Sequence, residues 1–423
     1  MSVWDEFQWR GTIYDGTEDL GAILASRKIT AYIGFDPSAS SLHVGSLLPV
    51  MSLARLQRFG HSPLAVVGGG TGLIGDPSGK SQERSLLSKE QVGSNLLGIR
   101  EQLECFLNFS STTNPARIIN NADWLTTISM MDFLRDVGKH FTVNYMLAKE
   151  SVSRRIGKEQ GLSFTEFSYM LLQAYDFLTL HDHYGCVLQM GGSDQWGNIL
   201  AGIELIRRTR GTRAHGLVFP LITTAGGVKF GKTESGTIWL DPRLTSPFRF
   251  FQFWLNTDDK DVIPYLKLFT FLSREEIEGL QAALESAPER REAQRILAKE
   301  VTRLVHGVTG LDKAERSSKV LFGGEITEMN ELDILDIFGE VPSGHIGKAF
   351  FDSGRPSVVD IAFSAGLVSS KSEARRLVLN GGLYLNNRRI SDVSQGVELS
   401  DCIGGQVLVL RKGQRQYHLV KIE

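Results

Sequence analysis

The sequence predicts an α/β protein whose main domain is a parallel sheet covered by helices, followed by a helical domain and a small α+β module. Residues 30–36 and 63–68 are apolar stretches typical of buried strands, and a helix over 47–59 is expected between them. Residues 116–120 and 186–190 continue the series of apolar strands. Because strands that alternate with helices usually pair in parallel, these segments indicate a single α/β sheet.

Composition divides the rest of the chain. The 423 residues suffice for two or three domains with a large core. We expect a first domain over residues 1–245 and a helical domain over 246–338, where charge-rich helical patterns begin. A linker rich in Gly, Ser and Pro is expected over 339–355, and the small module over 356–423.

The bulk properties exclude several classes of protein. The net charge is −2, so the whole chain gives no sign of a nucleic-acid partner, although the residues after 350 carry an excess of Lys and Arg. Cys105, Cys186 and Cys402 are too scattered for a disulfide framework or a zinc site. The acidic N-terminus is no signal peptide, and no apolar run reaches the length of a membrane span. We therefore expect a cytoplasmic protein without a membrane partner.

A phosphate-binding turn is expected before the first long helix. Residues 36–46 place a turn, the hydroxyl of Ser38, then His43 and Gly45 at the start of an apolar helix. Free N–H groups and the helix dipole at such a start favour anions. Far downstream, Lys229 to Thr233 form a short Gly-centred loop with two lysines, suited to close over the same phosphates.

Two glycine-rich matches between these segments are better explained as a turn. Gly70–Gly75 fits the dinucleotide pattern, but the Asp-Pro-Ser-Gly that follows would break the helix that a pyrophosphate needs. Gly75–Ser81 resembles a P-loop but has three residues between its glycines where four are required. We expect instead a turn that holds Asp76 and Lys80 at the end of a strand.

A polar stripe follows one face of an expected helix. Tyr169, Gln173 and Asp176 stand at i, i+4 and i+7, which places them on the same side. Their neighbours are apolar, so the helix should be largely buried and its polar groups need partners. A bound amino acid would supply such partners.

Five motifs in this order resemble those of bacterial-type tyrosyl-tRNA synthetases, a family of class I aminoacyl-tRNA synthetases. The motifs span residues 31–36, 72–80, 163–169, 191–198 and 229–233, and the likeness covers essentially the whole chain. The resemblance implies a Rossmann-like class I synthetase core that binds the nucleotide, an α-helical domain that contacts tRNA and a C-terminal S4-like RNA-binding domain. It also implies the activation of L-tyrosine with ATP to tyrosyl adenylate and transfer of tyrosine to tRNA(Tyr).

The resemblance assigns roles to particular residues. The residues implied to bind tyrosine are Tyr32, Asp36, Asp76, Tyr169, Gln173, Asp176 and Gln195. Those implied to bind ATP are Gly34, Ser38, His43, Gly45, Ser46, Gly192, Asp194 and Lys232. Those implied to assist the reaction are His43, Lys80, Arg84, Lys229, Lys232 and Thr233. Ser46 stands where the family usually has a second His, so its contact with the nucleotide stays open.

The C-terminal module carries the expected tRNA contacts. Lys371, Arg375 and Arg376 form a basic face on one expected helix, and Arg388 and Arg389 lie on a hairpin beside it. Such a face suits phosphate contacts in tRNA.

The remaining expectations concern small molecules and partners. ATP is a substrate that brings Mg²⁺, with no tightly bound cofactor and no metal site of the protein itself. The resemblance implies a homodimer. Two alternatives stay open: a tryptophanyl-tRNA synthetase, which should lack the pair Tyr32 and Asp176, and an RNA-binding protein that descends from a synthetase.

Overall fold

The computed structural model describes residues 2–78, 86–149, 152–153, 156, 161–227, 230–233, 236–326, 329–352 and 354–423, with only the backbone of 232 and 233. The chain forms two compact units, and each is described by itself. Unit 1 comprises residues 1–245 and 254–305, and unit 2 comprises 246–253 and 306–423. The boundaries at 253/254 and 305/306 fall inside helices, α11 (Pro247–Leu255) and α14 (Glu292–Leu321), and α14 is kinked at Gly307.

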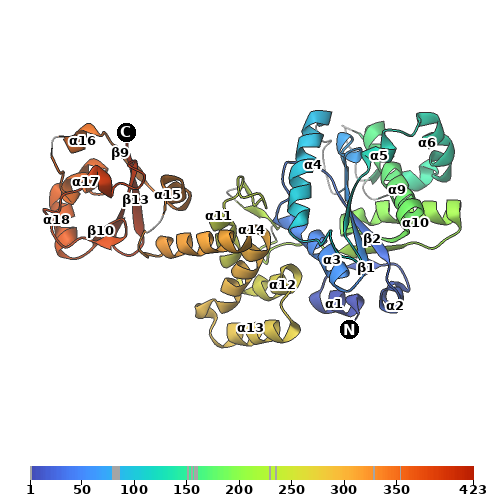
Figure 1. Ribbon diagram of the computed structural model, residues 1–423, viewed down its shortest axis with the longest axis horizontal. Coiled ribbons are helices and arrows are strands. Elements are labelled where there is room, and N and C mark those ends of the chain that lie inside the picture. The colour runs from blue at the N-terminus through green and yellow to red at the C-terminus, as the bar shows by residue number, and fades with distance from the viewer. Residues whose placement is uncertain are drawn as a thin grey trace. The chain divides into compact units, whose positions relative to one another are not determined.

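Unit 1 is built on a six-stranded sheet, seen at the centre of its helices in Figure 1. The strand order is β1-β6-β5-β2-β3-β4. The bounds are β1 (Asp15–Gly16), β2 (Thr30–Phe35), β3 (Ser62–Val67), β4 (Arg117–Asn120), β5 (Cys186–Gly192) and β6 (His215–Phe219). All pairs are parallel except β1 with β6. The predicted parallel α/β sheet is confirmed; the short antiparallel edge strand β1 was not expected.

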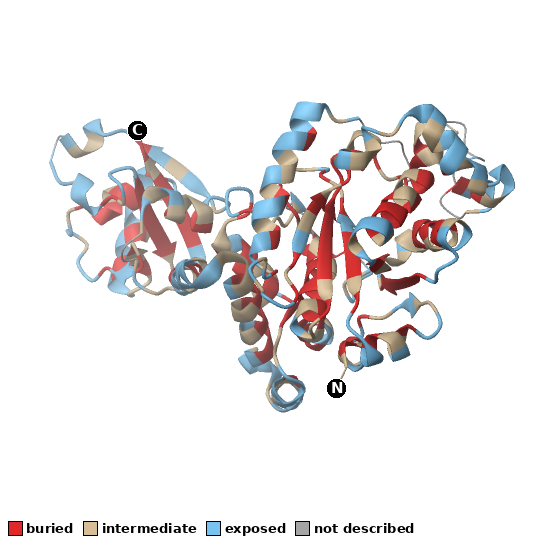
Figure 2. Ribbon diagram, turned by 45° about the vertical axis from the view of Figure 1, so that its right-hand side comes forward, coloured by how far each residue is buried: buried red, intermediate tan, exposed pale blue. Residues whose placement is uncertain are grey.

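Helices cover this sheet because its strands are apolar on both faces. Every residue of β6 is buried, as are five of the six residues of β3, and Figure 2 shows the strands of the central sheet largely in red. The α-helices described within residues 1–245 are α1 (Val3–Arg10), α2 (Leu20–Ser26), α3 (Leu47–Arg58), α4 (Lys89–Glu104), α5 (Ala122–Leu125), α6 (Met130–Asp136), α7 (Val143–Leu147), α9 (Phe164–Tyr184) and α10 (Trp196–Arg210). The helix expected over 47–59 is therefore present as α3.

Unit 1 also contains a small hairpin and two further helices. β7 (Lys232–Thr233) and β8 (Gly236–Thr237) form a small hairpin within the lysine-bearing loop. After it come α12 (Asp259–Phe269) and α13 (Arg274–Ser286), which agree with the helical pattern expected in this region. Ser273 and Glu276 form a capping box that starts α13.

Unit 2 ends in a five-stranded sheet of order β11-β10-β12-β13-β9. Its elements are α15 (Glu331–Phe338), β9 (Ser343–Ile346), α16 (Ala349–Asp352), α17 (Val358–Ser364), α18 (Lys371–Leu379), β10 (Leu383–Leu385), β11 (Arg388–Arg389), β12 (Val407–Lys412) and β13 (Gln416–Ile422). Apolar residues of α17, α18 and the strands, such as Ile361, Val378 and Leu408, share one core. The expected α+β module is present.

The structure differs from the sequence prediction at the expected linker over 339–355. Within this segment β9 pairs in parallel with β13, and α16 follows it. The segment becomes a strand because it can pair with the edge strand β13 and because Ile346 is buried in the core. Gly344 also lies so close to Ala365 that a side chain would overlap its backbone. Ser343 and Gly344, which contributed to the linker prediction, are therefore part of a packed edge strand.

Candidate active site

A cavity of about 400 Å³ opens where the parallel strands β2, β3 and β5 end. Open α/β sheets bind ligands at this edge. The lining includes all seven residues predicted to bind tyrosine: Tyr32, Asp36, Asp76, Tyr169, Gln173, Asp176 and Gln195. It also includes five predicted to bind ATP: Gly34, Ser38, Ser46, Gly192 and Asp194. The structure thus brings together residues that are far apart in the chain.

Tyr32 and Asp176 both line the cavity and lie close enough to interact electrostatically. Tyr32 is 2% exposed, and among the described residues its hydroxyl has no hydrogen-bond partner. Its ring packs on Phe177, with centroids 5.3 Å apart. Burial, and then the nearby Asp176, raise the pKa of Tyr32 well above its usual value, so the hydroxyl remains protonated. A buried hydroxyl without a partner needs a ligand group to satisfy it.

The Asp176 carboxylate is fixed by two neighbours that the sequence analysis did not identify. Trp124 Nε1–H donates to Oδ1 at 2.7 Å, and Asn121 Nδ2–H donates to Oδ2 at 2.9 Å. Burial raises the pKa of Asp176 to about 7, although both hydrogen bonds oppose the rise. The carboxylate is therefore held in one orientation while its charge stays poorly solvated.

A second polar group lies around Asp36. Tyr169 O–H donates to Asp36 Oδ2 at 2.9 Å, and Thr71 O–H donates to Oδ1 at 3.0 Å. Tyr169 comes from the predicted stripe on α9 and is 4% exposed. The stripe therefore faces the cavity, as its apolar surroundings indicated.

Asp76 and the amides beside it form the third group. Gln195 Nε2–H donates to Asp76 Oδ2 at 2.6 Å, and the Ser78 N–H donates to Oδ1 at 2.8 Å. Asn198 Nδ2–H donates to Gln173 Oε1 at 2.9 Å, which orients that amide. Burial raises the pKa of Asp76 despite these hydrogen bonds. Carboxylates and amide oxygens placed in this way suit a bound ammonium group.

The helix start beside the cavity is shaped by His43. Its Nδ1 accepts the Gly45 N–H at 3.0 Å, and its carbonyl oxygen accepts the Ser46 N–H at 2.7 Å. Ser46 lines the cavity, whereas His43 and Gly45 are not part of its lining. His43 also forms an antiparallel bridge with Trp239.

That bridge joins the two segments predicted to bind phosphate. The Val44 N–H donates to the Ile238 carbonyl at 3.0 Å, and the Ile238 N–H donates to the Gly231 carbonyl at 3.3 Å. Gly231 has φ +82°, and a Cβ there would lie 2.8 Å from Val44 Cγ2. The close approach and the left-handed backbone both require glycine. The lysine-bearing loop therefore rests on the start of α3.

Several predicted residues cannot be located in this way. Lys80, Arg84 and Lys229 lie outside the described residues. Lys232 and Thr233 are described by their backbone, which pairs with residues 236 and 237 in the β7–β8 hairpin. Their roles stay predictions.

Sequence reasoning missed four other residues of the site. Gln189, Thr71 and Asn121 line the cavity, and Trp124 reaches Asp176 from α5. A signal did exist for Asn121, since a polar residue directly after a strand of the parallel sheet falls at its ligand-binding edge. Trp124 gave no such signal, because an indole on a short helix is more often core.

The predicted basic face of unit 2 is exposed. Arg375 and Arg376 on α18 and Arg388 and Arg389 on β11 are all exposed. A Cβ at Gly381 would overlap the Arg389 guanidinium, so the hairpin and the end of α18 lie side by side. Lys371 instead forms an ion pair with Asp360, at 2.6 Å.

Two features are absent from the described part of the chain. It contains no cluster of three His, Cys, Asp or Glu residues that could hold a metal ion. None of the helices described is long and apolar enough to cross a membrane.

Comparisons with known proteins agree with this geometry. A family model described as class I tRNA synthetases (W and Y) matches residues 24–323. A second, described as the C-terminal domain of SYY-like tyrosine–tRNA ligases, matches residues 333–420.

Full-length relatives are also similar. A tyrosine–tRNA ligase of Roseiflexus castenholzii is 57% identical over 100% of this chain and 99% of its own length. One of Geobacillus stearothermophilus is 52% identical over 100% of both chains. Among solved structures, a C-terminally truncated mitochondrial tyrosyl-tRNA synthetase of Aspergillus nidulans is 31% identical with a TM-score of 0.69, covering 76% of this chain and 94% of that one.

Proposed function

The chain belongs to the tyrosine–tRNA ligases of the class I tRNA synthetases, and from this premise we propose how its cavity binds tyrosine. It activates L-tyrosine with ATP and transfers tyrosine to tRNA(Tyr). The observation that carries the proposal is the buried Tyr32 hydroxyl, which has no partner in the described part of the chain and lines the cavity together with Asp176. The substrate phenol donates to Asp176 and pairs with Tyr32.

The α-ammonium group of the substrate then lies near the polar groups around Asp36 and Asp76. Asp76, Tyr169 and Gln173 receive it, and their hydrogen bonds to Gln195, Asp36 and Asn198 support that orientation. Asp36 and Gln195 flank the reacting end. Since the acceptors are held before the substrate arrives, little ordering remains to be done on binding.

The chemical step is an in-line attack of the tyrosine carboxylate oxygen on the ATP α-phosphorus. A new P–O bond forms while the bond to the pyrophosphate breaks, and pyrophosphate leaves with its electron pair. Such a step needs positioning and neutralisation of charge more than covalent help. Gly34, Ser38, Ser46, Gly192 and Asp194 bind ATP along the cavity. The residues proposed to assist at the phosphates are His43, Gly45, Lys80, Arg84, Lys229, Lys232 and Thr233.

ATP is a substrate of this family, and Mg²⁺ accompanies it. Mg²⁺ usually keeps several waters and takes one or two carboxylates plus phosphate oxygens, so it does not require a cage of protein ligands. Mg²⁺ would supply positive charge to the phosphates.

We propose that tRNA(Tyr) is bound by the exposed basic face of unit 2. Arg375, Arg376, Arg388 and Arg389 would contact phosphates, with Lys371 beside them. The ranges 246–338 and 356–423 serve as the tRNA-contacting and S4-like domains, and 1–245 as the catalytic domain. The reaction would take place in the cytoplasm, where tRNA is charged for protein synthesis.

A homodimer is also proposed. Unit 1 exposes large apolar side chains on α6, α7 and the start of α9: Met130, Met131, Leu134, Val143, Leu147 and Phe164. An exposed apolar surface of this kind is typical of an association site. Sedimentation equilibrium should give a mass near twice the 46.8 kDa of the chain, and a single-chain mass would contradict the proposal.

Changing Tyr32 to phenylalanine tests the phenol site. We expect Tyr32→Phe to lower the preference for tyrosine over phenylalanine roughly tenfold, since one hydrogen bond to the substrate hydroxyl is lost. The measurement is kcat/KM for ATP–pyrophosphate exchange with each amino acid. Tyr175→Phe is the matched control, because Tyr175 precedes Asp176 on α9 but does not line the cavity. An unchanged preference in Tyr32→Phe would contradict the assignment.

A further inference from the structure

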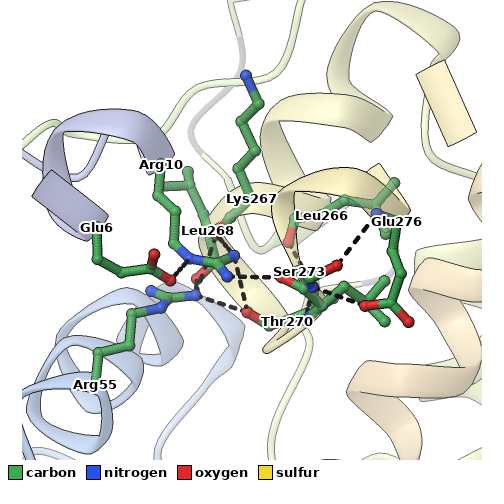
Figure 3. Close-up of polar contacts among 10 residues, drawn as sticks. Glu6, Arg10, Arg55, Leu266, Lys267, Leu268, Thr270, Ser273 and Glu276 are labelled. Carbon is green, nitrogen blue, oxygen red and sulfur yellow. Dashed lines mark hydrogen bonds and ion pairs between the residues drawn. The ribbon is translucent and has the colours of Figure 1, made fainter. Parts of the chain in front are cut away.

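Two buried arginines meet at the end of a helix outside the cavity. Arg10, the last residue of α1, is 4% exposed, and Arg55 in α3 is 1% exposed. Both guanidinium groups point at the C-terminal end of α12 (Figure 3). Glu6 pairs with Arg10 Nε and carries one negative charge against the two positive ones.

Backbone carbonyls hold these arginines. Arg55 Nη2 donates to the carbonyls of Lys267, Leu268 and Thr270 at 3.1, 2.7 and 2.8 Å. Arg10 donates to the carbonyls of Lys267 and Thr270 at 2.8 and 3.2 Å, and to that of Leu272 at 2.7 Å. The last carbonyls of a helix lack donors within the helix and form the negative end of its dipole. The two arginines therefore cap α12 from two other helices.

This cap carries a cost that a simple helix end would not. Arg55 Nε and Nη1 have no partner among the described residues, although the side chain is buried. Burial and the charge of Arg10 both lower the pKa of Arg55. Removing a cation from water costs several kcal/mol unless its partners are complete. The arrangement thus does more than end a helix, and the residues carried by α12 indicate what it holds.

Phe230 packs among three aromatic side chains, called the aromatic seat below, and α12 supplies two of them. The Phe230 ring stacks on Phe269, with centroids 5.2 Å apart and planes 12° apart, and meets the Tyr265 ring edge-on at 4.9 Å. Trp254 adds a third side, at 5.7 Å. Phe230 is 4% exposed and precedes Lys232 by two residues, so this seat fixes the loop next to its lysine.

α3 therefore governs the lysine-bearing loop at two points. In the turn that leads into it, Val44 lies against Gly231, where an added Cβ would come within 2.8 Å of Val44 Cγ2. Further along, Arg55 holds the end of α12, and α12 holds Phe230. Both contacts lie within unit 1. If either changed, the loop would move relative to the phosphate-binding start of α3.

We propose that Arg55, together with Arg10, is a positioning residue for tyrosyl-adenylate formation: it caps α12, so that Tyr265 and Phe269 seat Phe230 and hold Lys232 at the triphosphate. The inference rests on the proposed role of Lys232. Arg55 does not touch the substrates, and it acts through α12 and the loop. A displacement of about 1 Å in a catalytic group can reduce a rate roughly a hundredfold.

The test compares Arg55→Met with Gln57→Met. Gln57 lies on the same helix and donates to the carbonyls of Asn108 and Asn114, at 2.6 and 3.1 Å, but makes none of the α12 cap. Each full-length variant is assayed for the pre-steady-state rate of adenylate formation at saturating ATP, for the Kd of tyrosine and for thermal unfolding. We expect Arg55→Met to lower the rate about tenfold to a hundredfold, with tyrosine Kd within twofold. Gln57→Met should keep the rate, and Arg55→Lys should recover part of it.

Two further variants separate the possible failures. If Arg55→Met does not fold, Phe269→Leu breaks the seat without removing the cap and should lower the same rate with unchanged tyrosine Kd. A wild-type rate in folded Arg55→Met, or an equal loss in Gln57→Met, would overturn the inference. If Lys232→Ala also kept the wild-type rate, the proposed role of the loop would fail instead. Normal rates in Phe269→Leu would show that the seat does not position the loop.

Discussion

Lys232→Ala is expected to slow tyrosyl-adenylate formation by about a hundredfold to a thousandfold while tyrosine binds with nearly its normal Kd. The ammonium group of Lys232 acts on negative charge that develops on the leaving pyrophosphate, so its loss is felt in the transition state far more than in the ground state. The structure supports this because Gly231, in the loop that carries Lys232, lies against Val44 beside the helix start. Rapid-quench measurement of adenylate gives the rate, and fluorescence titration gives the Kd.

The matched control is Lys89→Ala, which removes the same charge from the exposed first residue of α4. This variant should form adenylate at the wild-type rate. If Lys232→Ala also did so, Lys232 would have no part in the reaction. If the substrate Kd rose while the rate at saturating substrate stayed the same, the lysine would bind substrate and transition state equally.

Reversing the charge of Arg375 and Arg376 is expected to separate the two half-reactions. Arg375→Glu/Arg376→Glu should leave adenylate formation unchanged and lower kcat/KM for tRNA about a hundredfold at physiological salt. The slope of log tRNA affinity against log salt concentration should also become shallower by roughly two, because two cations that displace counterions are gone. Filter binding across a salt series measures that slope.

A control with the same change in charge is available at the opposite edge of the sheet. Lys348 follows β9 and Lys421 lies on β13, whereas β11 forms the other edge. Lys348→Glu/Lys421→Glu should keep tRNA affinity within about twofold. Equal losses in both double variants would mean that the total charge of unit 2 is recognised and not a particular face.

The fold was predictable where a local pattern coincides with burial. The segments 30–36 and 63–68 are continuous apolar runs because both faces of a parallel sheet are covered, and they appear as β2 and β3. The stripe of Tyr169, Gln173 and Asp176 was equally clear, since polar residues on a buried helix must meet a partner. All three line the cavity.

Other features depend on contacts that no short segment contains. β9 is a strand only because β13, some seventy residues later, offers it an edge, so its glycines and serines indicated a linker instead. Trp124 is part of the site because α5 brings its indole to Asp176. The caps of Arg10 and Arg55 on α12 join residues more than two hundred positions apart. Such pairings are properties of the folded chain.

The measurement that tests the account most directly is ATP–pyrophosphate exchange with tyrosine, phenylalanine and tryptophan in parallel, on the unmodified protein. A buried hydroxyl and carboxylate left without partners should reject phenylalanine by about 10⁴ to 10⁵ in kcat/KM, a factor already known for tyrosine-specific enzymes of this family rather than obtained from this structure. Tryptophan should give no measurable exchange, since its larger ring would have to displace Tyr32 or Asp176 from their packed positions. Exchange with phenylalanine within tenfold of that with tyrosine would contradict the role assigned to Tyr32 and Asp176.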